Sequence, residues 1–160
     1  MRQIEVFEDN VWYTTNKGRI YHSTDKGFNW VVYNTNVTDF AGIRVSFANE
    51  NDGVYIDASG AVYRSFNAGA SWQQIDTQGP IYTTDLSYAP NSNTIFTTGA
   101  SSAGTGSSVS FDGGYNWTGI DAGTQHTEVE FIDESTGWSG GFNYSAVSYT
   151  HLTLPTSYAV

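Results

Sequence analysis

Aromatic and β-branched residues occur along the whole chain in short runs that are broken by Gly, Asn and Asp, as in residues 18–23 and 60–65. Runs of this kind are typical of strands, and the residues that break them favour tight turns. No segment is rich in the helix formers Ala, Leu, Glu and Lys. The pattern therefore predicts an all-β fold.

Three segments align without gaps on the pattern Ser-x-Asp/Asn-x-Gly-x-x-Trp, and the copies follow each other after 42 and then 45 residues. We call these segments boxes 1, 2 and 3. Repeats of this length are typical of solenoids and propellers. The four patterned residues are Ser23, Asp25, Gly27 and Trp30 in box 1, Ser65, Asn67, Gly69 and Trp72 in box 2, and Ser110, Asp112, Gly114 and Trp117 in box 3.

Each position of the box has a physical role. The Asp or Asn side chain can accept hydrogen bonds from backbone N–H groups of its own turn. The Gly supplies a positive φ without steric cost, and the Trp can bury its ring against the hairpin and a neighbouring sheet. Asn67 keeps the acceptor without the charge. We therefore expect a structural role for the boxes, with three glycines at positive φ and three buried Trp rings.

The boxes resemble the Asp-box, or BNR, repeat of sialidase-like β-propellers. The resemblance implies a partial propeller of about three and a half four-stranded antiparallel blades, with each box at the turn between the third and fourth strands. A second match, between residues 47–54 and 131–138, is separated by two repeats, and residues 7–12 look like a shortened copy of it. The implied blades span about 1–37, 38–78, 79–122 and, incomplete, 123–146 of a partial propeller over 1–146.

A fourth box is expected near position 149, but none is present in the last residues. Residues 147–160 instead resemble the translation of a transposase-based sequencing adapter, as found at the end of truncated metagenomic reading frames. We expect this tail to be foreign to the fold. The alternative is a genuine terminal strand, since Leu152 and Leu154 alternate with polar residues.

Charge and composition exclude several classes of function. The net charge is −10, from six basic and sixteen acidic residues, so nucleic acid and anionic membrane surfaces are disfavoured as partners. The chain has no Cys and no apolar run long enough to insert into a membrane. His22 and His126 lack the spacing of a metal motif, and single acids such as Asp9 suggest turn capping. We predict no catalytic residue, cofactor or metal site in this chain.

Two hypotheses about function remain. The first is a non-catalytic propeller segment of a larger bacterial protein, secreted or at the cell surface by resemblance, that binds a protein or glycan partner or acts as a scaffold beside the remaining blades. Its ligand-facing loops would be those opposite the boxes, at 16–18, 57–60, 76–80 and 99–106. The alternative is a fragment of a sialidase-like glycoside hydrolase. That chemistry requires an arginine cluster, whereas this chain has four Arg, of which Arg19 and Arg64 are expected on blade surfaces.

Overall fold

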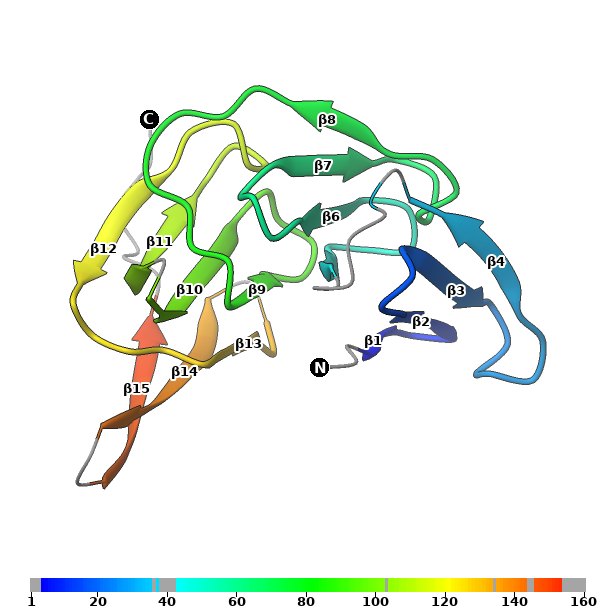
Figure 1. Ribbon diagram of the computed structural model, residues 1–160. Helices are drawn as coiled ribbons and strands as arrows, with labels where there is room; N and C mark the ends of the chain where they lie inside the picture. Colours follow the sequence, from blue (N-terminus) through cyan, green and yellow to red (C-terminus); the bar gives the residue numbers. More distant parts are fainter. Residues whose placement is uncertain are drawn as a thin grey trace.

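The computed structural model describes residues 4–35, 37, 43–102, 104–133, 135–143 and 146–153, of which 142, 143 and 146–153 are described by their backbone only. These residues form strands and no helix, arranged as four antiparallel sheets around a common centre (Figure 1). The prediction of an all-β partial propeller is confirmed. No helix in the described part of the chain could span a membrane.

Each sheet is a blade whose strands pair in sequence order. The fourth, blade 4, has three described strands. The strands are β1 Ile4–Phe7, β2 Asn10–Thr14, β3 Arg19–Ser23 and β4 Val31–Asn34 in blade 1; β5 Arg44–Phe47, β6 Gly53–Ile56, β7 Val62–Ser65 and β8 Gln73–Ile75 in blade 2; β9 Asp85–Tyr88, β10 Ile95–Ser101, β11 Gly104–Ser110 and β12 Thr118–Ala122 in blade 3; and β13 Glu128–Phe131, β14 Thr136–Asn143 and β15 Ala146–Thr153 in blade 4.

Strand register shows which residues are equivalent in successive blades. On the innermost strands, Val6, Phe47, Tyr88 and Phe131 pair with Val11, Gly53, Ile95 and Gly137 respectively. Val11, Gly53 and Ile95 are in turn the partners of the first residue of each box, namely Ser23, Ser65 and Ser110. The sequence match made Phe7 the equivalent of Phe47, whereas the strand register makes Val6 its equivalent, one residue earlier. Phe7 instead pairs with Asn10 at the end of a shorter hairpin.

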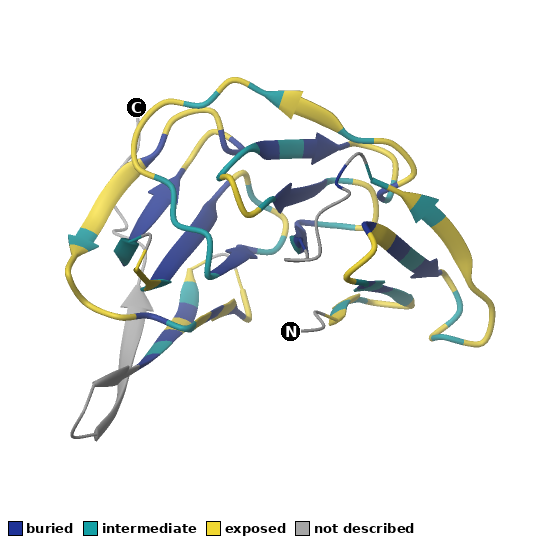
Figure 2. Ribbon diagram, viewed as in Figure 1, coloured by how far each residue is buried: buried dark blue, intermediate teal, exposed yellow. Residues whose placement is uncertain are grey.

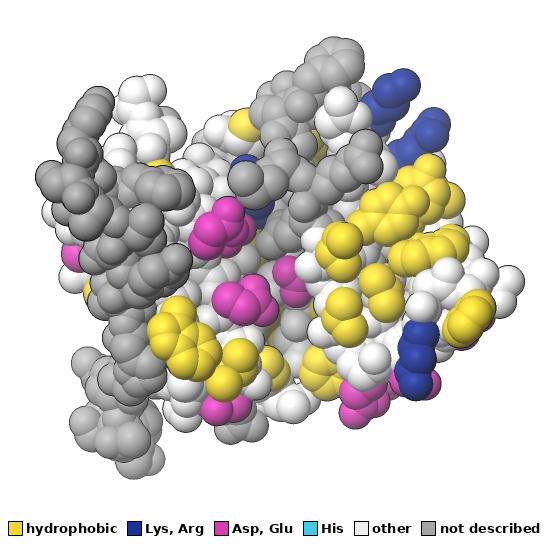
Figure 3. All heavy atoms as spheres, turned by 90° about the horizontal axis from the view of Figure 1, so that it is seen from below, with side chains coloured by type: hydrophobic (Ala, Val, Ile, Leu, Met, Phe, Trp, Pro, Cys, Tyr) yellow, Lys and Arg dark blue, Asp and Glu magenta, His cyan; other side chains and the backbone are white. Residues whose placement is uncertain are grey.

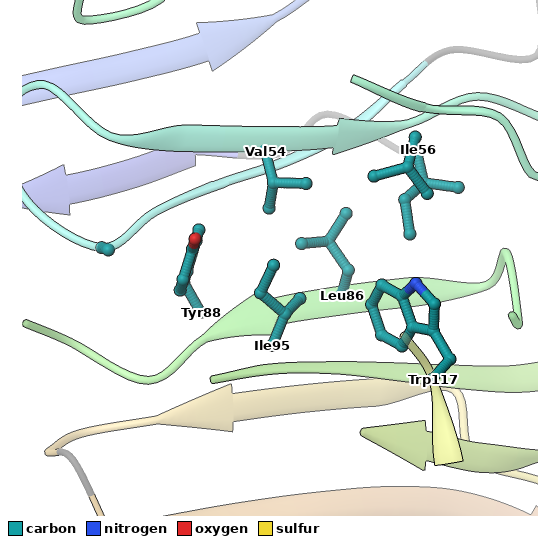
Figure 4. Close-up of a cluster of buried hydrophobic side chains, with 8 residues drawn as sticks. Val54, Ile56, Leu86, Tyr88, Ile95 and Trp117 are labelled. Atoms are coloured by element: carbon teal, nitrogen blue, oxygen red, sulfur yellow. The ribbon is translucent and has the colours of Figure 1, made fainter. Parts of the chain in front are cut away.

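The core lies between blades. Trp12 of blade 1 stacks on Phe47 of blade 2 with ring centroids 4.0 Å apart, and Phe96 of blade 3 stacks on Phe131 of blade 4 at 4.4 Å. Figure 2 shows buried positions concentrated on the inner and middle strands. Between blades 2 and 3, side chains from facing sheets meet in one cluster (Figure 4), formed by Ala48, Val54, Ile56, Val62, Leu86, Tyr88, Ile95 and Trp117. The fold is therefore held by contacts between successive blades.

Each blade consequently has two packing faces. We call the face toward the preceding blade the leading face and the face toward the next blade the trailing face. The residues Val6, Phe47, Tyr88 and Phe131 belong to the leading faces. The preceding residue on each innermost strand pairs with a residue of the second strand that belongs to the trailing face. These trailing-face residues are Trp12, Val54, Phe96 and Trp138.

The tail contributes a strand to blade 4. β15 pairs with β14 over its whole length. The position equivalent to the first box residue falls at Leu152 rather than near 149, because the hairpin between β14 and β15 is longer than that of blade 2, from which the expected position was taken. In the strand register, residues 146–153 therefore occupy the position of the third strand of a blade. This is the arrangement expected if the tail is a genuine strand. Residues 154–160 lie outside the described residues.

We predict that deleting residues 147–160 leaves the midpoint of chemical unfolding nearly unchanged. The physical reason is that β15 is the last strand of the described sheet and that its contacts are chiefly with β14. The measurement is urea denaturation of the full chain and of residues 1–146. A clearly lower midpoint for the shorter chain would identify β15 as an integral strand and remove the adapter interpretation.

Candidate functional site

The boxes form the turns between the third and fourth strands of blades 1, 2 and 3. In box 1 the Asp25 carboxylate accepts hydrogen bonds from the Asn29 backbone N–H at 2.8 Å and the Ser23 hydroxyl at 2.8 Å. The Ser23 hydroxyl oxygen accepts from the Gly27 N–H at 2.8 Å. Hydrogen bonds from the Asn29 side chain, from the Asn29 backbone N–H and from the Ser23 hydroxyl lower the pKa of Asp25 to about 2. The Asp25 carboxylate is thus engaged in hydrogen bonds within its own turn.

The same bonds recur in the other boxes. Asn67 and Asp112 each accept from a backbone N–H four residues later at 2.9 Å, and each box Trp donates its indole N–H to the carbonyl of the box Gly. The φ angles of Gly27, Gly69 and Gly114 are 92°, 85° and 99°, as expected. Because Asn67 makes the same turn without a charge, hydrogen-bond geometry is what the box requires.

The residue before each box Gly also has a positive φ, at 59° for Lys26, 58° for Ala68 and 76° for Gly113. In boxes 2 and 3 the carbonyl of this residue accepts a hydrogen bond from the preceding blade. The Trp12 indole donates to the Ala68 carbonyl at 3.0 Å, and the Arg64 guanidinium donates to the Gly113 carbonyl at 2.8 Å. The boxes therefore bind blades together as well as closing turns. The sequence pattern held no sign of this link, because its donors differ in residue type and in strand.

The expectation of three buried Trp rings is wrong for box 1. Trp117 is 5% exposed, Trp72 is half-buried, and Trp30 is 39% exposed. The rings differ because the box Trp lies on the leading face. Trp117 packs with Val54, Ile56 and Val62 of blade 2, and Trp72 packs against the core between blades 1 and 2. No blade precedes blade 1 in the described part of the chain, so Trp30 stays partly open to solvent.

The expectation that Arg64 lies on a blade surface is also wrong. Its side chain is buried between blades 2 and 3, where the guanidinium lies over the Phe66 ring at 4.8 Å and over the Tyr88 ring at 5.9 Å. Arg19 is exposed on β3, Arg44 lies on β5, and Arg2 is outside the described residues. The three described Arg residues thus form no common anion site.

The predicted ligand-facing loops differ in their placement. Residues 16–18 and 57–60 form the turns between the second and third strands, and the Asp57 carboxylate caps its own turn by accepting from the Ser59 and Ala61 N–H groups. Residues 99–101 and 104–106 are mostly paired strand rather than loop. The segment 76–80 was expected opposite the boxes, but Gln78 instead exchanges backbone hydrogen bonds with Tyr115 and Trp117 of box 3.

Four carboxylates gather where the innermost strands meet. We call Glu5, Asp85, Glu128 and Glu130 the axial carboxylates. They come from β1, β9 and β13, which border the centre of the array in Figure 1, and acidic side chains occupy the middle of the face in Figure 3. Glu5 interacts electrostatically with Glu130 and with Asp85, although the residues are far apart in sequence. One cation, Arg44, acts on Asp85.

The surroundings of Glu5, Asp85 and Glu130 raise the pKa of each and favour the protonated form. Burial, followed by repulsion from Glu130, raises the pKa of Glu5 to about 8. Burial also raises the pKa of Asp85 to about 7, although its carboxylate accepts a hydrogen bond from the Val129 N–H at 2.9 Å. The pKa of Glu130 is raised by desolvation and by Glu128. The centre of the array therefore becomes more negative as the pH rises above neutrality.

A Ser–His–Asp set joins blades 3 and 4. The Ser139 hydroxyl lies 2.7 Å from Nδ1 of His126, and Nε2 of His126 lies 3.1 Å from the Asp121 carboxylate. These residue types can carry nucleophilic catalysis. Ser139 and His126 are however only 1% and 5% exposed, so a substrate carbonyl cannot reach the hydroxyl. The set connects the sheets. Its members have no characteristic spacing, so the sequence offered no signal for it.

The isolated turn acids serve their turns. Asp133 accepts from the Ser135 and Thr136 N–H groups, and Asp9 pairs with Lys26 at 3.1 Å across an exposed surface. Among the described residues no three His, Cys, Asp or Glu side chains are grouped so that they could hold a metal ion. His22 stacks on Trp12, with ring centroids 4.7 Å apart, and its Nε2 lies 2.9 Å from the Asn10 side-chain oxygen.

The chain matches no protein-family model and no curated protein. It is similar in structure to YCF48 bound to D1 peptide, with 18% identity and a TM-score of 0.61, and the match covers 92% of this chain and 47% of that one. For the GH74 enzyme of Niastella koreensis the identity is 18%, the TM-score 0.67 and the coverage 92% and 22%. For the computationally designed Ika4 protein the identity is 15% and the TM-score 0.62, and the match covers 93% of this chain and 89% of that one.

These similarities show the fold. The chain is a β-propeller segment, and it spans about half the length of the YCF48 chain that it matches.

Proposed function

We propose that this chain is a non-catalytic propeller segment of a larger secreted or cell-surface bacterial protein, and that it binds a basic segment of a protein partner at the axial carboxylates. The observation that carries the proposal is the convergence of four acids from three blades on the centre of the array, where Arg44 acts on Asp85. The net charge of −10 adds long-range attraction for a basic partner.

Three further features support a binding role. The box side chains are engaged within their own turns, and Ser139 and His126 of the Ser–His–Asp set are buried between sheets. YCF48, which has a similar fold, has been solved with a bound peptide. Carboxylates attract guanidinium groups through charge and through bidentate hydrogen bonds, so Arg side chains suit this site.

We expect a short fluorescein-labelled peptide of alternating Arg and Gly to bind the chain, and the double variant E128Q/E130Q to weaken binding about threefold to tenfold. The affinity for the unmodified chain should increase between pH 6 and 9. Glu5 and Asp85, whose pKa values are raised to about 8 and about 7, ionise over this range, whereas Arg stays charged. Fluorescence anisotropy at constant ionic strength measures both effects.

The matched control is E8Q/E50Q, which removes the same charge from the exposed turns that follow β1 and β5 and leaves the axial carboxylates intact. Equal weakening by both double variants would show that the peptide responds to net charge alone and would remove the axial site. Binding of an alternating Gln and Gly peptide with the same affinity would likewise contradict a charge-based site.

The glycoside hydrolase alternative makes a separate prediction. The chain should not cleave a fluorogenic sialoside faster than the buffer does, because the described Arg residues lie on different strands and Arg64 is buried. A fluorimetric assay of the purified chain measures this. Turnover that is lost in R44A would move a catalytic site into these blades and replace the binding proposal.

A further inference from the structure

We infer that a pocket beside box 2 binds a ligand whose carboxylate adjoins an apolar group, and that Arg64 is the residue that holds the carboxylate. The pocket lies at the turn between β7 and β8, the two outer strands of blade 2 (Figure 1). The axial carboxylates lie on innermost strands of other blades. The inference therefore does not rest on the proposed binding of a basic segment.

The pocket combines one cation with aromatic and neutral polar groups. It has a volume of about 230 Å³. Its lining consists of Arg64, Phe66, Asn67, Ser71, Trp72 and Gln73. Arg64 is the one charged residue in this lining. Aromatic walls with a few polar groups are typical of small-molecule sites, and the single cation suits a ligand group with one negative charge.

Arg64 has a donor that the protein itself does not use. Nη1 donates to the Gly113 carbonyl at 2.8 Å, whereas Nε has no hydrogen-bond partner among the described residues. Arg64 is only 6% exposed, and a buried donor of a charged group is costly to leave unpaired. A ligand oxygen would complete its hydrogen bonding. A carboxylate would in addition match the charge and the planar shape of the guanidinium.

Box 2 is also the one box that lacks the acid of the pattern. Asn67 stands where the other boxes have Asp25 and Asp112, and all three side chains accept from the backbone N–H four residues later. The turn thus forms with either residue type. An aspartate at this position would put a negative charge into the lining of the pocket and would repel an anion. The neutral amide keeps the positive charge of Arg64 uncompensated there.

The repeat provides an internal comparison for the rest of the pocket. Arg64 pairs across the strands with Gln73, which also lines the pocket. The equivalent pairs are His22 with Val31 in blade 1 and Val109 with Thr118 in blade 3. Both blades form their box turns without an Arg or a Gln at these positions. The turn therefore does not require the polar groups that line the pocket.

Phe66 covers the guanidinium on the solvent side. The Arg64 Cζ lies 4.8 Å from the centroid of its ring, and Phe66 is 60% exposed. A cation–π contact at an exposed site is weak, so the ring can turn to another rotamer and uncover Nε. The displaced ring then needs a new apolar contact. For this reason the ligand should carry an apolar group next to its carboxylate.

Two probes of nearly equal shape test the charge of the ligand. N-acetylphenylalanine has a carboxylate beside an aromatic ring, and N-acetylphenylalaninamide lacks the charge. In heteronuclear NMR titrations of the full chain, the acid should shift the backbone amide signals of Asn67, Ser71 and Gln73 saturably. The amide should bind at least about tenfold more weakly. E128Q/E130Q should bind the acid as the unmodified chain does, so the outcome is independent of the axial site.

R64M and N67D test the two residues that carry the inference. R64M removes the cation and should weaken binding of the acid at least about tenfold. N67D introduces the acid that boxes 1 and 3 carry, so the turn should form as it does there. This variant should weaken binding about threefold to tenfold. The matched controls R19A and N34D remove or add the same charge at exposed positions of blade 1 and should bind normally.

Several results would overturn the inference. They are the absence of saturable binding of the acid, equal affinity for the acid and its amide, and full affinity in R64M or N67D. Equal weakening in the controls would show a response to net charge alone. Glucuronate, a carboxylate on a polar sugar ring, is the third probe. If glucuronate bound more tightly than N-acetylphenylalanine, the apolar group would be wrong and the ligand would be an acidic sugar. Circular dichroism establishes that each variant is folded.

Discussion

Replacing Trp117 by Ala should lower the free energy of unfolding by about 3–5 kcal/mol, as expected for truncation of a buried large aromatic ring. Trp117 is 5% exposed, packs against blade 2, and donates its indole N–H to the Gly114 carbonyl at 2.8 Å. The substitution leaves a cavity between two sheets, where the neighbouring strands cannot close without shifting a whole blade. Urea denaturation followed by Trp fluorescence and by circular dichroism gives the difference.

Trp30 provides the internal comparison, because it has the same place in box 1 and makes the same indole hydrogen bond. Being 39% exposed, it should cost about 1 kcal/mol or less when changed to Ala. Both substitutions are measured in the otherwise unmodified chain under the same conditions. If both substitutions lowered the free energy of unfolding equally, the indole hydrogen bond, and not packing against a preceding blade, would account for the contribution of the box Trp to stability.

Local sequence determined the repeat, the strands and the turns. The Ser, Asp or Asn, Gly and Trp of each box act through bonds within eight residues, so their spacing predicts the hairpins and the positive φ of Gly27, Gly69 and Gly114. Local pattern could not predict burial. Trp30 and Trp117 occupy the same position, and only the presence of a covering blade makes them different.

The candidate site could not be predicted for a related reason. Glu5 and Glu130 lie in different blades, and they approach each other only because the innermost strands converge on one centre. Neither residue belongs to a motif. The Ser–His–Asp set likewise depends on how blade 4 docks on blade 3. Residue type along the chain indicates what each strand can do, whereas the curvature of the array decides which side chains meet.

After Trp117, Arg64 is the residue whose substitution we expect to lower stability most. Its equivalents in blades 1 and 3 are His22 and Val109, so neither the repeat nor the charge predicts a buried side chain. The guanidinium donates to the Gly113 carbonyl and is enclosed by Phe66 and Tyr88. R64A should destabilise the chain by about 2–4 kcal/mol, because it creates a cavity and leaves a carbonyl without its donor.

R64M and R19A separate the causes of that loss. Met fills most of the space without a buried charge, so R64M should lie within about 1.5 kcal/mol of the unmodified chain. Arg19 is exposed, and R19A should change stability by no more than about 0.5 kcal/mol. The measurement is urea denaturation of the three variants side by side. If R64A cost no more than R19A, Arg64 would be a surface residue after all, and the link from blade 2 to box 3 would contribute nothing. If R64M were as unstable as R64A, the hydrogen bond to Gly113 would outweigh packing, and the box carbonyl would be the main tie between these blades.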